Sequence, residues 1–240
     1  MFSIIHTAKL PEDLADKFCE QLIIWINETQ ENVFHIALSG GKTPLVLFSL
    51  LAEKYENKVQ WQKIHFWWVD ERMVHTDDSE SNFGVADRLL FSKIGVPQSQ
   101  IHRIKGENEP YEEAKQYGAE IISQVPIENY WPAFDLILLG MGDDGHTASI
   151  FPDQVQLMDS SEITAIAIHP VTGQKRITLT GRVINNARRV AFLVTGVSKS
   201  AIFNEIIEKS PDALRFPASH IRPKEELHWF IDEEVWKRIY

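Results

Sequence analysis

Hydrophobic and polar positions follow one another along this chain with two different periods. In residues 11–29 (PEDLADKFCEQLIIWINET) the large apolar side chains recur at intervals of three and four, which predicts an amphipathic helix packed on a core. Residues 33–39 (VFHIALS) are instead apolar at almost every position and stop at a pair of glycines. A short apolar run of this kind predicts a strand that is buried on both faces.

The two kinds of segment alternate to the end of the chain. Further strands are predicted at residues 64–70, 134–142, 163–169, 176–180, 189–196 and 226–232. Further helices are predicted at residues 81–91, 109–124 and 198–209, with a helical turn at the C-terminus. Alternating helices and doubly buried strands indicate a mostly parallel sheet with helices on both faces, a doubly wound, Rossmann-like α/β fold. No linker or low-complexity tract interrupts the pattern, so we expect a single domain over residues 1–240.

Composition narrows the classes of partner. The 240 residues include 24 Lys and Arg against 34 Asp and Glu, a formal net charge of −10, which disfavours nucleic acid and anionic membrane surfaces. A phosphate ligand would therefore need a local cluster of cations. The single cysteine, Cys19, excludes an intrachain disulfide and a cysteine-based metal site. With no signal-peptide pattern and no membrane-spanning run, we expect a cytoplasmic protein.

Ligands of open α/β sheets gather beyond the carboxyl ends of the strands, so the residues after each strand are the candidates for chemistry. The first such segment is SGGKTP (39–44), where Gly40 and Gly41 let the backbone approach an anion and Lys42 adds a charge. A helix should follow, with Thr43 as its cap and Pro44 in its first position. The alternative is a glycine turn without a ligand.

The second segment is VDER (69–72), which brings carboxylates and a guanidinium to the sheet edge. Arg72 is suited to bidentate binding of phosphate oxygens, and the alternative is an ion pair of Arg72 with Asp70 or Glu71. The polar run that follows (HTDDSE, 75–80) is interpreted as a solvated loop and not as a metal site. No metal and no cofactor are predicted.

The third segment is GMGDDGHTASIFP (140–152). Its glycines match the spacing of a dinucleotide-binding loop, but Asp143 and Asp144 would repel a pyrophosphate at the helix N-terminus, so we reject that interpretation. The loop does place an imidazole beside a carboxylate. Imidazole is the side chain that titrates nearest neutrality, so His146, oriented by Asp144, suits a general base acting on water. The alternative is a structural histidine.

The fourth segment is VTGVSK (194–199). Lys199 falls in the first turn of a predicted helix, where a cation is unfavourable unless it serves a ligand such as phosphate. Arg176, at the start of RITLT, is a further candidate cation. For both residues simple surface exposure is the alternative. No G-x-S-x-G, C-x-x-C or H-E-x-x-H motif is present, so covalent catalysis is not indicated.

Taken together, SGGKTP, VDER with SNFGVADRLL, GMGDDGHTASIFP, and RITLT with RVAFLVTGVSK resemble the 6-phosphogluconolactonase family, in matching order from about residue 33 to residue 199. The resemblance implies a hydrolase acting on 6-phospho-D-glucono-1,5-lactone in the oxidative pentose phosphate pathway, without metal. It further implies that His146 is the base that activates water and that Asp144 is its neighbour. By the same match Gly41, Lys42 and Thr43 form the phosphate loop, and Arg72 and Lys199 hold the phosphate. Many relatives carry Ser at the position of Lys42.

Two alternatives stay open. Glucosamine-6-phosphate deaminase has a similar Asp-Gly-His loop, and Asp70 matches its carbon-acid base, but its Asn-Glu pair is replaced here by Ile150-Phe151-Pro152. A phenylalanine cannot supply the carboxylate charge, which disfavours this function. The other alternative is a sugar-phosphate sensor without catalysis, although the chain has no helix-turn-helix segment and is acidic. The expected partner is thus a small phosphorylated sugar lactone.

Overall fold

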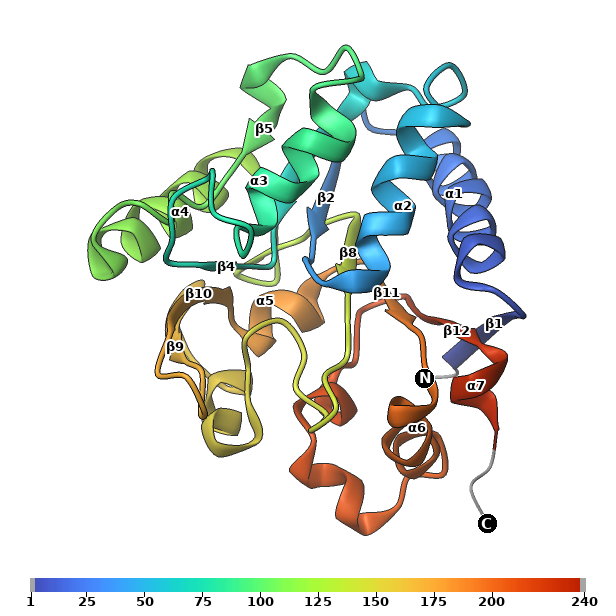
Figure 1. Cartoon of the computed structure of the whole chain (residues 1–240). Coiled ribbons are helices and arrows are strands. Elements are labelled where there is room, and N and C mark those ends of the chain that lie inside the picture. Colours follow the sequence, from blue (N-terminus) through green and yellow to red (C-terminus); the bar gives the residue numbers. More distant parts are fainter. Residues whose placement is uncertain (1–2, 238–240) are drawn as a thin grey trace.

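A parallel sheet of seven strands runs through the centre of the molecule in the order β1-β12-β11-β8-β2-β3-β5 (Figure 1). The computed structural model describes residues 3–237. The strands of this sheet are β1 (Ser3–Ala8), β2 (Phe34–Leu38), β3 (Ile64–Trp68), β5 (Ile101–His102), β8 (Leu136–Leu139), β11 (Arg189–Val194) and β12 (Glu226–Asp232). Each neighbouring pair is parallel. The predicted α/β fold with a mostly parallel sheet is confirmed.

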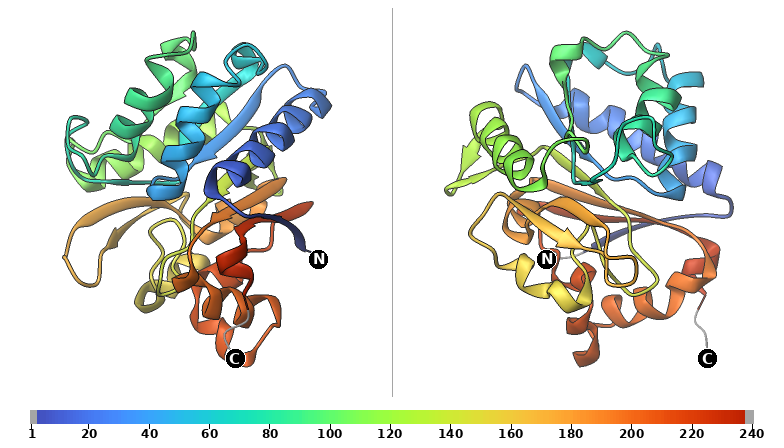
Figure 2. Two further views of the ribbon diagram at one scale, coloured as in Figure 1. Left: turned by 45° about the vertical axis from the view of Figure 1, so that its right-hand side comes forward. Right: turned by 60° about the vertical axis from the view of Figure 1, so that its left-hand side comes forward.

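Helices connect the strands, and Figure 2 shows them from two further sides. They are α1 (Pro11–Glu28), α2 (Lys42–Glu53), α3 (Asn82–Ala86), α4 (Pro110–Gln124), α5 (Gly181–Asn186), α6 (Ser200–Ile207) and α7 (Glu233–Trp236). The longest of them, α1, starts with a proline and has Glu12 and Asp13 in its first turn, where negative charge is favourable. It buries the apolar side chains that its sequence spacing predicts and lies beside α2.

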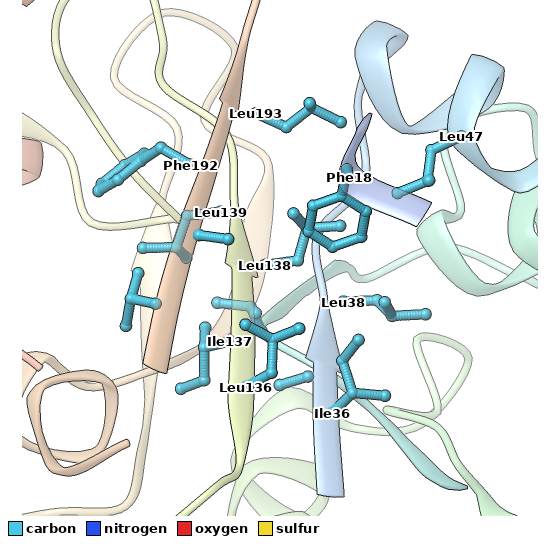
Figure 3. Packing of buried hydrophobic residues seen from close by; sticks show 14 of the residues in the cluster. Phe18, Ile36, Leu38, Leu47, Leu136, Ile137, Leu138, Leu139, Phe192 and Leu193 are labelled. Carbon is cyan, nitrogen blue, oxygen red and sulfur yellow. The ribbon is translucent and has the colours of Figure 1, made fainter. Parts of the chain in front are cut away.

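The core lies around the middle strands of the sheet. All the side chains of β2 and β8 are buried, so both faces of the sheet are covered. Figure 3 shows Phe18 of α1 and Leu47 of α2 packed near Ile36, Leu38 and Leu138. Burial of such side chains stabilises the fold by roughly 1.5–3 kcal/mol each, and it fixes the strands whose carboxyl ends carry the polar loops.

A second, antiparallel sheet contains β4 (Asp70–Arg72), β10 (Lys175–Leu179) and β9 (Thr164–Ile168), in that order. The sequence predicts one strand over residues 64–70, and this is wrong at its end, because the chain changes sheets at Val69. The Val69 N–H donates to the Leu38 carbonyl of β2 at 2.9 Å, while its own carbonyl accepts from Leu179 of β10 at 2.7 Å. The strands predicted at 163–169 and 176–180 also belong to this small sheet.

Two strands of the central sheet have no counterpart among the predicted ones. The edge strand β1 has mostly exposed or half-buried side chains, so it lacks the apolar run of an inner strand. The other, β5, has two residues. A hairpin of β6 (Ile127–Glu128) and β7 (Trp131–Pro132) forms the third sheet. None of the helices within residues 3–237 has the length and apolar character that crossing a bilayer requires. The single domain over residues 1–240 stays a prediction.

Candidate active site

The loops after β2, β3, β8 and β11 enclose a cavity of about 410 Å³ at the carboxyl ends of the strands. The structure brings most of the predicted site residues to its wall, although they are far apart along the chain. Those that line it are Gly40, Gly41, Thr43, Asp70, Arg72, His146, Arg176 and Lys199. This is the position that the topology of an open α/β sheet favours for a ligand.

The imidazole of His146 is held by the carboxylate of Asp144, which itself does not line the cavity. Nδ1 of His146 is 2.6 Å from Oδ1 of Asp144, and the backbone N–H of His146 donates to the same oxygen at 3.0 Å. Partial burial raises the pKa of Asp144, but the hydrogen bonds and the charge of His146 outweigh this and lower the pKa to about 2. The carboxylate is therefore an acceptor, and Nδ1 carries the hydrogen. The His146 side chain is 27% exposed, so solvent reaches it.

The glycine loop before His146 makes this contact feasible. The N–H of Gly142 donates to the carbonyl of His146 at 2.9 Å, which folds the loop back on itself. A Cβ on Gly142 would lie 2.2 Å from Nδ1 of His146 and 2.6 Å from Oδ1 of Asp144, so a larger residue would displace the pair. Gly145 has a φ of +79°, and its missing side chain leaves room for Phe216. The glycines thus serve the geometry of the imidazole and carboxylate.

The ring of Phe151 packs against several groups of the site. It is buried, and its centroid is 4.9 Å from that of His146 and 5.2 Å from that of His169. The guanidinium carbon of Arg176 lies 5.6 Å from the same ring centroid. Phe151 therefore fills the space between the imidazole and one of the candidate phosphate cations with apolar surface.

The first loop differs from the sequence prediction in its capping. Gly41, with a φ of 109°, is the N-cap of α2, so the helix begins at Lys42 and not after a Thr43 cap. The hydroxyl of Thr43 is instead 2.9 Å from that of Thr195, which joins the loop after β2 to the loop after β11. The positive φ of Gly41 lets the chain turn into the helix there, which the residue types alone do not reveal. The side chain of Lys42 lies outside the part of the chain that the structure describes.

Arg72 reaches the cavity from the end of β4. Its Nη1 donates to the Glu80 carbonyl at 2.8 Å, and its Nε is buried without a partner. Among residues 3–237 no ion pair joins Arg72 to Asp70 or Glu71, so the alternative of an internal ion pair is wrong. The Glu71 carboxylate accepts backbone N–H bonds from Arg72, Asn82 and Phe83, each at 2.8 Å. It therefore ties β4 to the start of α3.

Arg176 and Asp70 lie next to each other through Ser149. The Ser149 hydroxyl donates to Oδ2 of Asp70 at 2.6 Å, and Nη1 of Arg176 is 3.5 Å from the same hydroxyl. Both charged side chains are nearly inaccessible from bulk solvent. Burial and the nearby charge of Arg72 lower the pKa of Arg176, while nearby carboxylates act in the opposite direction. Both guanidinium groups belong to residues that line the cavity.

Lys199 reaches the wall of the cavity from the 3-10 turn Val197–Lys199. Its Nζ is 2.6 Å from Oδ1 of Asp143, in the loop after β8. Hydrogen bonds from Lys199 and Ser198 lower the pKa of Asp143. Lys199 thus reaches the cavity as predicted, but as half of an ion pair.

Asp143 and Asn82 also line the cavity and are not among the predicted site residues. In the sequence Asp143 stands out only as a charge that would repel a pyrophosphate, and its partner Lys199 lies 56 positions along the chain. Asn82 donates to the Asp70 carbonyl at 2.9 Å and lies over Gly40, where a Cβ would be 1.8 Å from its Oδ1. The feature of the sequence that could have indicated Asn82 is its position directly after Ser81, the N-cap of α3. Within the described residues no group of three His, Cys, Asp or Glu side chains is arranged to hold a metal ion.

Comparison with known proteins places the chain among relatives along nearly its whole length. The sequence model of the family glucosamine-6-phosphate isomerases/6-phosphogluconolactonase matches residues 9–229. The 6-phosphogluconolactonase of Haemophilus influenzae is 42% identical over 220 residues, which cover 91% of this chain and 92% of that protein. The 6-phosphogluconolactonase of Aggregatibacter actinomycetemcomitans is 41% identical over 226 residues, with 93% and 94% covered.

A solved structure agrees with these sequence relationships. The crystal structure of 6-phosphogluconolactonase from Thermotoga maritima has a TM-score of 0.84 and 29% sequence identity, and the match covers 96% of this chain and 100% of that one. Fold, sequence and the order of the loop motifs lead to one assignment: the chain belongs to the glucosamine-6-phosphate isomerase/6-phosphogluconolactonase family.

Proposed function

We propose that this chain hydrolyses 6-phospho-D-glucono-1,5-lactone to 6-phosphogluconate, the lactonase step of the oxidative pentose phosphate pathway. It is a hydrolase of a carboxylic ester. The observation that carries the proposal is the convergence, in one cavity, of His146, which Asp144 holds from behind the wall, with Arg72, Arg176 and Lys199. Relatives that are 42% and 41% identical and named 6-phosphogluconolactonase support it. The buried thiol of Cys19 and the acidic composition favour the cytoplasm as its location.

The phosphate of the lactone binds among the three cations and the backbone of the Gly40–Gly41 turn. Two guanidinium groups and an ammonium supply charge-assisted hydrogen bonds to phosphate oxygens, and the start of α2 adds N–H groups. Binding at this end of the sugar places the lactone carbonyl carbon, C1, toward His146. Holding the lactone carbonyl and His146 in one cavity turns a bimolecular encounter into a reaction between positioned groups. This positioning can supply a large part of the rate enhancement.

His146 then acts as the general base. Since Asp144 holds the hydrogen on Nδ1, the lone pair is on Nε2, and Nε2 takes a proton from water as the water oxygen bonds to C1. The tetrahedral adduct collapses when the bond between C1 and the ring oxygen breaks, and the proton on Nε2 passes to that oxygen. The direct product is the carboxylic acid of 6-phosphogluconate with its free hydroxyl, and His146 returns to its starting state. The acid then releases its proton to solvent and leaves as the carboxylate.

The deaminase alternative rests on Asp70, whose carboxylate faces the cavity and is held by Ser149. Ring opening and proton transfer in that reaction need a second carboxylate beside the histidine. The side chain packed against His146 is Phe151, which carries no charge. The site therefore favours water activation over carbon-acid chemistry.

The test is an assay with freshly made 6-phosphogluconolactone, whose disappearance is followed above the spontaneous rate, with glucosamine 6-phosphate in parallel. We expect turnover of the lactone and none of the amino sugar. His146→Ala should lower kcat by about 10²- to 10⁴-fold and leave binding of 6-phosphogluconate intact, which serves as the control for folding. Unchanged turnover in this variant would contradict the role of His146. Tight binding of a sugar phosphate without any turnover would support the sensor alternative.

A further inference from the structure

The ion pair between Lys199 and Asp143 sets Lys199 apart from the other two cations of the cavity. Arg72 is bonded to a backbone carbonyl, and Arg176 to a side-chain amide and a hydroxyl. Neither guanidinium has an ion pair with a carboxylate among the described residues. Among the described residues, Lys199 alone of the three forms an ion pair with a carboxylate, that of Asp143 at 2.6 Å. The positive charge that a phosphate would meet is therefore smaller than the three side chains suggest.

The two members of the pair differ in how freely they can move. The Lys199 side chain is 17% exposed, whereas that of Asp143 is 72% exposed. Asp143 can turn into solvent and regain its hydration at little cost, while Lys199 stays in the wall of the cavity. The pair can thus be opened from the Asp143 side without disturbing the core.

We propose that Asp143 competes with the phosphate of the substrate for Lys199. It is a positioning residue that holds Lys199 in the empty site and releases it when phosphate binds. This inference rests on the proposed function, since it concerns the same phosphate. A phosphate dianion displaces the carboxylate because it brings a higher charge and also contacts the two guanidinium groups. A single carboxylate on a ligand has no such advantage over Asp143, so the pair favours phosphorylated ligands and keeps phosphate affinity moderate, which helps the product leave.

The inference predicts that Asp143→Asn binds phosphorylated ligands more tightly. Removal of the competing charge should lower the Kd for 6-phosphogluconate and for inorganic phosphate by about threefold to tenfold, as expected for loss of a partly exposed ion pair plus a nearby like charge. The KM for the phosphorylated lactone should fall with it, while the KM for unphosphorylated gluconolactone stays the same. Titration calorimetry measures the two dissociation constants, and Asp143→Ser is a second variant in case the first folds poorly.

Two further variants show whether the effect acts through Lys199. In a Lys199→Ala background the Asp143→Asn change should give a much smaller gain in affinity, because only the loss of a like charge near the phosphate remains. Glu53→Gln removes one exposed carboxylate from the other end of α2 and should leave both Kd values within about twofold, which controls for net charge.

Unchanged or weaker phosphate binding in both Asp143 variants would overturn the inference, and so would a gain that is equally large without Lys199. Failure of the proposed function gives a different result. A wild-type chain that binds 6-phosphogluconate but hydrolyses no lactone contradicts the lactonase proposal, while the calorimetric comparison still decides the role of Asp143. A wild-type chain that binds neither phosphate compound overturns both.

Discussion

The tautomer of one histidine depends on one carboxylate in this site, and that dependence can be tested at the scale of a single residue. Asp144→Asn keeps the size of the side chain but removes the charge that fixes the hydrogen on Nδ1 of His146. We expect kcat for the lactone to fall by about 10²- to 10⁴-fold, with little change in KM because the phosphate cations are untouched. Steady-state kinetics checks this. A rise in KM as large as the fall in kcat would mean that Asp144 acts in binding.

The pKa of Asp144 adds a pH dependence with a definite sign. This pKa is lowered in the folded state to about 2, from an ordinary value of 3.8. Its contribution to stability is therefore present above pH 3.8 and is lost as the pH falls toward 2. The difference in unfolding free energy between the wild type and Asp144→Asn should therefore shrink as the pH falls below about 4.

Residue-scale features were predictable from sequence where the partners are neighbours in the chain. Asp144 and His146 are two positions apart, so their contact follows from a short loop. The pairing of Lys199 with Asp143 joins loops on two different strands, and no local pattern encodes it. Likewise, the choice of Gly41 over Thr43 as the cap of α2 depends on a backbone angle that glycine permits and the sequence does not state.

At the scale of elements, Glu71 connects β4 to α3 and so supports both Arg72 and Asn82. Its carboxylate accepts hydrogen bonds from the backbone of Arg72, Asn82 and Phe83 and from the Ser81 hydroxyl. Burial raises the pKa of Glu71 to about 7, although the backbone N–H groups act in the opposite direction. Since the folded-state pKa lies above the ordinary value of 4.5, its contribution to stability is full below pH 4.5 and is lost as the pH rises through about 7.

Glu71→Gln should therefore destabilise the protein in a pH-dependent way. The amide nitrogen cannot accept, so at least one buried N–H loses its partner at a cost of about 1–3 kcal/mol. The deficit relative to the wild type should be largest near pH 5 and become smaller toward pH 8, because only the wild type carries the buried charge that is penalised at high pH. Urea unfolding across this range measures it. A deficit that grows with pH would contradict the raised pKa. The exposed Glu53→Gln is the control, and its difference in unfolding free energy from the wild type should not change with pH.

Strands were predictable where their side chains are buried throughout. They were not predictable where the choice of neighbouring strand sets their limits. The inner strands β2, β8 and β11 are apolar on both faces and were expected from that pattern. The exposed edge strand β1 was missed, and residues 64–70 were assigned to one strand, since a run of apolar letters does not say which neighbour each residue bonds. The same limit hides the separate sheet of β4, β10 and β9, which carries Arg72 and Arg176 to the cavity.

At the scale of the whole molecule, a chain with a net charge of −10 can bind an anion only where the topology gathers cations at one place, as it does here around the cavity. Arg72 arrives from the small sheet and Lys199 from beyond β11, so phosphate affinity is a property of the assembled fold. If the phosphate end of the substrate is bound there and the chemistry occurs at His146, the two ends should respond separately to mutation. Arg72→Ala should raise KM for the phosphorylated lactone by about 10- to 100-fold, as for loss of charge-assisted hydrogen bonds.

Unphosphorylated gluconolactone provides the matched substrate for this variant, since it keeps the reacting ester and lacks the charged group. Its kcat/KM should change little in Arg72→Ala, because Arg72 is hydrogen-bonded to the Glu80 carbonyl and not to His146 or Asp144, so the pair keeps its geometry. Steady-state kinetics with both lactones measures the ratio of the two effects. An equal loss for both substrates would mean that Arg72 acts at the reacting carbonyl and not at the phosphate, and the division of the cavity into a binding end and a reacting end would then be wrong.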